Sequence, residues 1–127
     1  MLLKRRIPRV ATAALVLGAC GDDAAATPSN VGTVYCQGLE RCAYNEFITF
    51  YAGEEPGTGD LDRCIYVRTA YFAREAGDFE MAYGESCREA FLALADCERR
   101  FLLTECDTVM ADLACADLAQ TRDDACR

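Results

Sequence analysis

Nine cysteines in a chain of 127 residues constrain this protein's fold more than any other feature. No two of them form a C-x-x-C pair and the chain has no histidine, so the ligand pattern of a structural zinc site is missing. In a short exported chain, an even number of cysteines indicates a disulfide framework. Eight of the nine are therefore expected to form four structural disulfides, which leaves one cysteine for another role.

The first 19 residues have the pattern of an export signal. A cationic start is followed by an apolar run over residues 10–16, which is much shorter than the roughly 20 residues that a membrane-spanning helix needs. The small residues Gly18 and Ala19 then precede Cys20, as at the cleavage site of a signal peptide. We therefore expect residues 1–19 to be a signal peptide that is removed on export. Its cations are Lys4, Arg5, Arg6 and Arg9.

The segment Leu17-Gly18-Ala19-Cys20 resembles the lipobox of bacterial lipoproteins, in which Leu stands three residues before the cysteine. The resemblance covers about residues 4–20. It implies that the mature chain begins at Cys20, with diacylglycerol on the sulfur and an acyl chain such as palmitate on the amine. Two or more such chains hold a protein stably in a membrane. Removing Cys20 leaves an even set of cysteines, namely Cys36, Cys42, Cys64, Cys87, Cys97, Cys106, Cys115 and Cys126.

The charge of the chain changes at the same boundary. Loss of the signal removes four cations and leaves nine arginines, no lysine and all 21 acids, which gives a formal net charge of −12. That balance disfavours nucleic acid and anionic lipid surfaces as partners, because both attract basic patches. Residues 20–33 are small and polar and contain Pro28, which favours a flexible lipidated tether. Residues 34–127 are expected to be the folded, cysteine-rich domain.

Apolar residues recur at steps of three and four through this domain, which predicts an all-α, disulfide-stapled bundle of about four helices. The first helix is expected over residues 34–52, although the run 47–51 is β-prone and a strand is the alternative there. An acidic loop over residues 53–59 follows. The next helix is expected over residues 61–76, with Asp60 as its N-cap and a glycine at its end.

The second half of the domain is predicted as a helical hairpin. Ser86 and Glu89 form a capping box that starts a helix to about residue 100. A turn over residues 101–104 then leads to a last helix that ends near residue 120. One continuous helix over residues 86–122 is the alternative, because no Gly or Pro marks the turn.

The disulfide pairing is predicted from helix geometry. Cys36 and Cys42 are six residues apart, about 9 Å along a helix, which is too far for a bridge between them. In an antiparallel hairpin, the residue numbers of two facing positions add up to a nearly constant value. This rule places two bridges, one inside the other, across the hairpin of residues 86–120. This spacing resembles, over about 30 residues, the twin-cysteine hairpins of the coiled-coil-helix–coiled-coil-helix type. Cys115 lies opposite Cys106 on an ideal helix, so either Cys106 lies outside the helix proper or Cys115 pairs elsewhere, for example with Cys126. The predicted pairs are Cys36–Cys126, Cys42–Cys64, Cys87–Cys115 and Cys97–Cys106.

The residue types disfavour an enzyme. Without histidine the chain has neither a Ser–His nor a Cys–His nucleophile system, and it has no phosphate-binding loop. With 21 acids, neighbouring pairs such as Asp96 with Glu98, or Asp123 with Asp124, are expected on solvated faces. We therefore expect no catalytic residue, no metal and no cofactor, and keep a carboxylate-based hydrolase as a remote alternative. Calcium is a second alternative, at the acidic side chains Glu54, Glu55, Asp60 and Asp62.

The aromatic residues suggest a binding role. Six Tyr and six Phe are many for so small a domain, and four short helices cannot bury all of them. We predict a lipid-anchored exported protein with a non-enzymatic binding domain, whose partner is a protein or an apolar ligand. A carrier of a small apolar ligand or lipid in a helical pocket is the alternative. The layout resembles small cysteine-rich lipoproteins that some Gram-negative bacteria encode in number, which implies the cell envelope. Gly21 favours the outer membrane, with the domain facing the periplasm or the surface.

Overall fold

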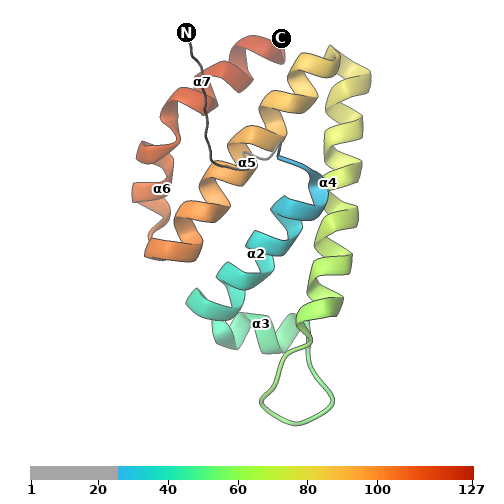
Figure 1. The fold of residues 1–127 in the computed structure, drawn as a ribbon, viewed down its shortest axis with the longest axis vertical. Coiled ribbons are helices and arrows are strands. Elements are labelled where there is room, and N and C mark those ends of the chain that lie inside the picture. Colours follow the sequence, from blue (N-terminus) through green and yellow to red (C-terminus); the bar gives the residue numbers. More distant parts are fainter. Residues whose placement is uncertain (1–25) are drawn as a thin grey trace, which may run out of the picture.

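The structure, a computed structural model, describes residues 26–127, in which every regular element is a helix (Figure 1). The predicted all-α class is confirmed, but this part of the chain has six helices where about four were expected. Two are additional because the first and last predicted helices are each broken once, at Ala43 and at Cys115. None of these helices is long and apolar enough to cross a membrane. Their bounds are α2 Pro28–Cys42, α3 Tyr44–Phe50, α4 Leu61–Tyr83, α5 Glu85–Glu105, α6 Thr108–Ala114 and α7 Ala116–Ala125.

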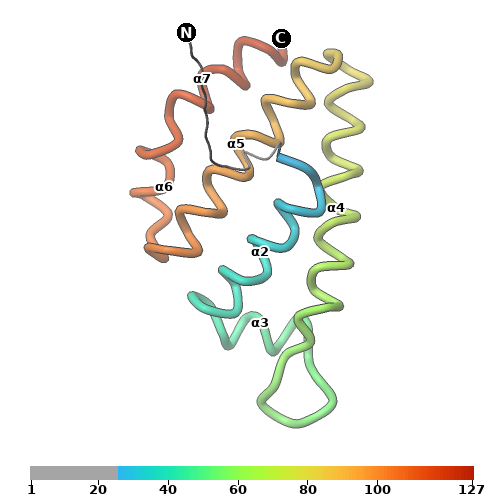
Figure 2. Tube along the Cα trace, in the orientation of Figure 1, coloured from blue at the N-terminus to red at the C-terminus, as the bar shows by residue number. Residues whose placement is uncertain are grey.

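The helices α2, α4 and α5 pack together as the core of the bundle, and α6 with α7 runs back along α5 (Figures 1 and 2). The chain turns between α4 and α5 at Gly84, whose φ of 101° favours a residue without a Cβ atom. Two clusters of buried residues hold the bundle. One is Val31, Phe72, Ala76, Leu92 and Ala95, and the other is Cys36, Phe47, Tyr51 and Cys64.

The first helix begins six residues earlier than predicted, so the expected tether of residues 20–33 is wrong at its end. Thr27 caps α2 by accepting a hydrogen bond from the Asn30 N–H at 3.1 Å, and Pro28 occupies the first turn. Proline is favoured there, because its missing N–H has no partner within the helix in any case. Val31 is fully buried in the core. The folded domain therefore begins by residue 28, while residues 20–25 lie outside the described part.

The single helix expected over residues 34–52 is two helices. The backbone leaves helical geometry at Ala43, with φ of −144°, and α3 then crosses the lower end of the bundle in Figure 1. This bend places Phe47 at zero exposure against the second buried cluster. The strand alternative over residues 47–51 is wrong, because that segment is helical to Phe50. A single bridge between Ala52 and Gly59 closes the acidic loop.

The helix α4 begins as predicted and ends later. The Asp60 carboxylate accepts a hydrogen bond from the Arg63 N–H at 3.0 Å, as an N-cap does. The helix then continues through Gly77 to Tyr83 instead of stopping at residue 76. A glycine inside a helix costs only about 1 kcal/mol, and the buried contacts of Ala76 and Phe72 offset that amount.

The hairpin turn lies later than predicted. The helix α5 starts after Gly84 without the expected capping box at Ser86, and it continues through residues 101–104 to Glu105. Cys106 then adopts a left-handed conformation with φ of 55°, and the Asp107 carboxylate caps α6. The alternative of one helix over residues 86–122 is therefore wrong as well. Thr104 and Glu105 form the last residues of α5, and the side chain that caps α6 is that of Asp107.

All eight cysteines of the domain are paired, as predicted, but none of the four predicted pairs forms. The expected rule for an antiparallel hairpin holds between α5 and the segment of α6 and α7. The bridges Cys97–Cys115 and Cys87–Cys126 have nearly the same midpoint in the sequence, at Cys106–Asp107. The predicted sum failed because the turn was placed too early. Cys106 lies in the turn, outside both helices, and is free to reach α2. The bridges are Cys36–Cys64, Cys42–Cys106, Cys87–Cys126 and Cys97–Cys115, with Cα–Cα distances of 6.0, 5.5, 4.8 and 6.0 Å.

Candidate functional site

Neither of two sites considered from the sequence, the lipidation site and the acidic loop, is found as an assembled site in the described residues. Cys20 lies outside them. In the acidic loop, Asp60 is used to cap α4 and pairs with Arg63 at 3.9 Å. Within residues 26–127 no three His, Cys, Asp or Glu side chains are placed to hold a metal ion. The calcium alternative therefore has no ligand set at this loop.

The neighbouring carboxylates considered from the sequence have local partners. The two carboxylate oxygens of Asp96 share the Nε–H of Arg100, one helical turn away, at 2.9 and 3.0 Å. Asp123 pairs with Arg122 at 3.0 Å, and Asp124 pairs with Arg127. These acids are surface ion-pair partners, and they do not face each other across a cleft.

Three adjoining hollows meet at Arg99 on α5. The first, about 260 Å³, lies between α2 and the end of α5, beside the Cys42–Cys106 disulfide. The second, about 240 Å³, lies between α4 and α5. The third, about 140 Å³, lies between α5 and α6. We call this surface the Arg99 groove, because Arg99 lines all three hollows. Tyr35, Glu98, Leu102 and Thr108 each line two.

A larger hollow of about 590 Å³ is a weaker candidate. Its lining residues all come from the short segment 42–50 at α3. A binding site that surrounds its ligand needs walls from more than one element. This hollow is an open surface formed by a single short helix. The Arg99 groove instead has walls from α2, α4, α5 and α6.

Arginine and tyrosine side chains alternate across the groove. The guanidinium carbon of Arg99 lies 4.7 Å from the ring centre of Tyr35, and that of Arg68 lies 4.5 Å from the same ring. Arg68 is also 5.5 Å from the ring of Tyr71, which in turn has Arg74 at 5.8 Å. We call these five residues the Arg–Tyr series. They come from α5, α2 and α4, so folding alone brings them together.

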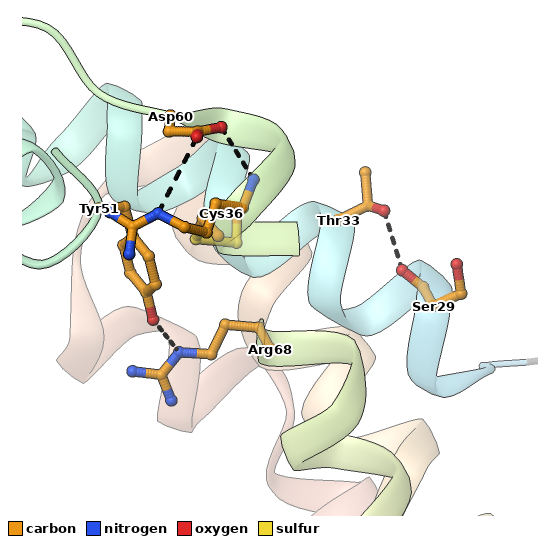
Figure 3. Close-up of a disulfide and its surroundings, with 8 residues drawn as sticks. Ser29, Thr33, Cys36, Tyr51, Asp60 and Arg68 are labelled. Atoms are coloured by element: carbon orange, nitrogen blue, oxygen red, sulfur yellow. Dashed lines mark hydrogen bonds and ion pairs between the residues drawn. A yellow bond between two sulfur atoms is a disulfide. The ribbon is translucent and has the colours of Figure 1, made fainter. Parts of the chain in front are cut away.

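A hydrogen bond from Arg68 fixes part of this series. Its Nε atom donates to the Tyr51 hydroxyl at 2.9 Å, and Figure 3 shows the two side chains pointing at each other beside the disulfide of Cys36. Tyr51 is buried and Arg68 is half-buried. The bond uses one N–H of the guanidinium, which leaves its other donors available.

The cations of the Arg–Tyr series form no salt bridges within the described residues. Of the nine arginines in residues 26–127, five form ion pairs with Asp or Glu, and Arg41 donates to the carbonyl of Thr104 at 3.3 Å. The other three make no ion pair within the described residues. They are Arg68, Arg74 and Arg99, all members of the series. In a chain with so many acids, this places on one surface three arginines that form no salt bridge with residues 26–127.

Glu98 adds a titratable group to the groove. Burial raises the pKa of its carboxyl above the usual value of 4.5, and the negative charge of Asp112 acts in the same direction. The positive charges of Arg99 and Arg122 lower the pKa and oppose that rise. Glu98 and Asp112 both line the smallest hollow.

Several apolar side chains remain outside the core, as the number of aromatic residues predicted. Five of the twelve rings are exposed, including Phe50 at 64% and Tyr66 at 77%. The helix α6 also exposes Val109, Met110 and Leu113 next to the groove. Nothing in the described residues covers this apolar face of α6.

Sequence reasoning did not select Arg68 or Arg99 as site residues. Their partners come from three helices that are far apart in the sequence, so no local motif contains them. One signal was present, since Arg68, Tyr71 and Arg74 follow one another at steps of three on a single helix. Comparison with protein-family models, with curated proteins and with solved structures found no match, so the function must be inferred from the chemistry of the groove.

Proposed function

We propose that this chain is an exported, lipid-anchored protein whose helical domain binds a ligand in the Arg99 groove without catalysing a reaction. The lipobox-like segment ending at Cys20 and the even set of eight further cysteines support export and anchoring. By the same argument the anchor is in the cell envelope, with the outer membrane favoured by Gly21.

The observation that carries the binding role is the set of adjoining hollows around a half-buried arginine that forms no salt bridge with the described part of the chain. Arg99 would hydrogen-bond an anionic group more strongly at this position than in open water, because burial lowers the local dielectric constant. A charged side chain that is partly desolvated and has no salt bridge contributes little to stability alone. Its presence in a concave surface therefore favours a binding role over a structural one.

The disulfides support the same proposal. Cys42–Cys106 lies at the edge of the largest of the three hollows, and Cys97–Cys115 ties α5 to the start of α7. Walls that are cross-linked before the ligand arrives do not have to be ordered by it, which leaves more of the interaction energy for affinity.

The two alternative functions fit the groove less well. A purely apolar ligand would cover the guanidinium groups of Arg68 and Arg99 and leave them without hydrogen-bond partners. A carboxylate-based hydrolase needs an acid and a base that face each other across the substrate. Glu98 and Asp112 share only the smallest of the three hollows, about 140 Å³, which leaves little room for a substrate between them.

The anchor is tested by mass spectrometry of the membrane fraction. We expect an N-terminal peptide that begins at an acylated Cys20, and a Cys20→Ser variant that is not acylated and leaves the membrane fraction. A soluble wild-type protein that retains residues 1–19 would refute the anchored form.

The binding role is tested in cells with a photoreactive amino acid at Thr108, which is exposed and lines two of the hollows. The matched control carries it at Met81, which is 89% exposed and lies outside the groove. Mass spectrometry of the purified full-length protein should find an adduct at Thr108 and none at Met81. Equal labelling at the two positions, or labelling at neither, would refute a binding site in the groove.

A further inference from the structure

We infer that the ligands of the Arg99 groove are small aromatic carboxylates, an assignment that rests on the proposed binding function. The carboxylate would pair with the guanidinium groups of Arg99 and Arg68, and the aromatic ring would lie in the hollow of about 240 Å³ beside them.

Arg68 and Arg99 line the same hollow and pack on the same aromatic ring. A guanidinium that packs on an aromatic ring uses its flat face, while its N–H donors point outward in its plane. Arg99 and Arg68 both contact the ring of Tyr35, at 4.7 and 4.5 Å, so their donor edges lie near one ring. Such edges match the planar, two-oxygen geometry of a carboxylate.

The lining of the second hollow indicates the rest of the ligand. Four aromatic rings line it, namely Tyr35, Tyr71, Phe72 and Phe91, together with Ala95. Aromatic rings pack well against one another in offset or edge-to-face arrangements, as Tyr35 and Phe72 already do at 6.1 Å. A volume of about 240 Å³ limits the ligand to one or two fused rings with a short acidic side chain.

The charge of the whole protein disfavours larger anions. The chain carries 21 acids, and their long-range field repels a polyanion or an anionic membrane. A ligand with a single carboxylate meets the local positive charge of the Arg–Tyr series and carries little charge for the rest of the surface to repel. Glu98 lines the same hollow and disfavours a second negative charge on the ligand.

The absence of tryptophan from the chain allows a direct test. Indoleacetate is a suitable probe, because its indole fluorescence can be excited where tyrosine does not absorb. The anisotropy of that fluorescence is measured as the full-length acylated protein, purified in detergent with its disulfides intact, is titrated in. The matched neutral ligand is tryptophol, which has an alcohol in place of the carboxylate. Acetate and inorganic phosphate are added as competitors.

Two arginines that are adjacent on α5 supply the matched variants. Arg99→Gln removes the groove cation, whereas Arg100→Gln removes the same charge from a side chain that pairs with Asp96 and lines none of the three hollows. We expect indoleacetate to bind saturably, and tryptophol to bind at least about tenfold more weakly, as does indoleacetate to Arg99→Gln. Arg100→Gln should bind like the wild type.

Each other outcome would overturn the ligand assignment. If tryptophol binds as tightly as indoleacetate, the ligand is apolar. If phosphate or acetate, each added by itself, displaces all of the indoleacetate, the groove is a simple anion site. Equal losses in the two variants would indicate a general effect of charge. If indoleacetate does not bind while Thr108 still acquires a specific adduct, the assignment fails and the proposed function stands. If both experiments are negative, both proposals fail.

Discussion

Replacing Gly32 by Ala tests whether α2 and α4 pack as closely as the structure shows. A Cβ atom at residue 32 would lie 2.7 Å from the Thr69 Oγ1 atom, 2.8 Å from its backbone N and 3.1 Å from its Cα. Two of these atoms belong to the backbone of α4 and cannot rotate away. The substitution therefore forces the two helices apart at a fully packed contact.

The expected magnitude is the difference between two opposing effects. Overpacking of this kind costs about 1–3 kcal/mol of unfolding free energy, while Ala gains about 0.5–1 kcal/mol over Gly within a helix. Gly38→Ala is the matched control on the same helix. Its Cβ would lie 3.6 Å from the Leu103 Cα, an ordinary contact, so only the helical gain applies. We expect Gly32→Ala to be less stable than Gly38→Ala by about 2 kcal/mol.

The assay is thermal unfolding of both variants by circular dichroism, with the four disulfides kept oxidised. A difference of that size lowers the Tm of Gly32→Ala by roughly 10 °C relative to Gly38→Ala in a domain of this length. A further replacement, Thr69→Ala in the Gly32→Ala background, removes the Oγ1 contact and should restore stability only in part. A Gly32→Ala protein as stable as Gly38→Ala would refute the close α2–α4 contact.

Three further predictions follow from single features. Thr69→Val should be at least as stable as the wild type in thermal unfolding, because the buried Thr69 hydroxyl has no hydrogen-bond partner, and a clear loss would contradict this. Limited reduction followed by alkylation and peptide mapping should label Cys42 and Cys106, which are both exposed, before Cys36 and Cys64, which are fully buried; simultaneous labelling would contradict that order. Burial raises the pKa of the Glu98 carboxyl in the folded state. This group therefore contributes to the free energy of unfolding at pH values below its unfolded-state pKa near 4.5, and the contribution is lost as the pH rises through the folded-state pKa. Glu98→Gln should thus have a higher Tm than the wild type above that range and nearly the same Tm below it, and a difference that is independent of pH would refute the assignment.

The parts of the fold that depend on local sequence could be predicted, and those that depend on packing could not. The spacing of apolar residues and the Asp60 cap are local, and they gave the all-α class and the start of α4. The end of α5 depends on contacts across the bundle, and placing it before Cys106 made both predicted hairpin bridges wrong, because Cys97 pairs with Cys115 and Cys87 with Cys126. The rule that the residue numbers of facing positions have a constant sum was itself correct, because with the turn at Cys106 it pairs Cys97 with Cys115.

The groove was beyond sequence reasoning for a related reason. Arg99, Tyr35 and Arg68 belong to three different helices, and their proximity exists only after α2 has packed between α4 and α5. The composition gave one general indication, since all the cationic side chains in the described residues are arginines. Arginine stacks on aromatic rings and keeps its donors free, which lysine does not do.

The disulfides explain how so small a domain can keep cations and aromatic rings in a surface groove. A core of this size contributes limited stability by itself, and each bridge adds about 2–4 kcal/mol by restricting the unfolded chain. The fold therefore does not depend on burying Tyr71 or neutralising Arg99. Three of the four bridges attach to α5 or to Cys106 at its end, which is the helix that carries Arg99. The groove is thus held in shape by covalent bonds, and its donors stay accessible for the ligand that we propose.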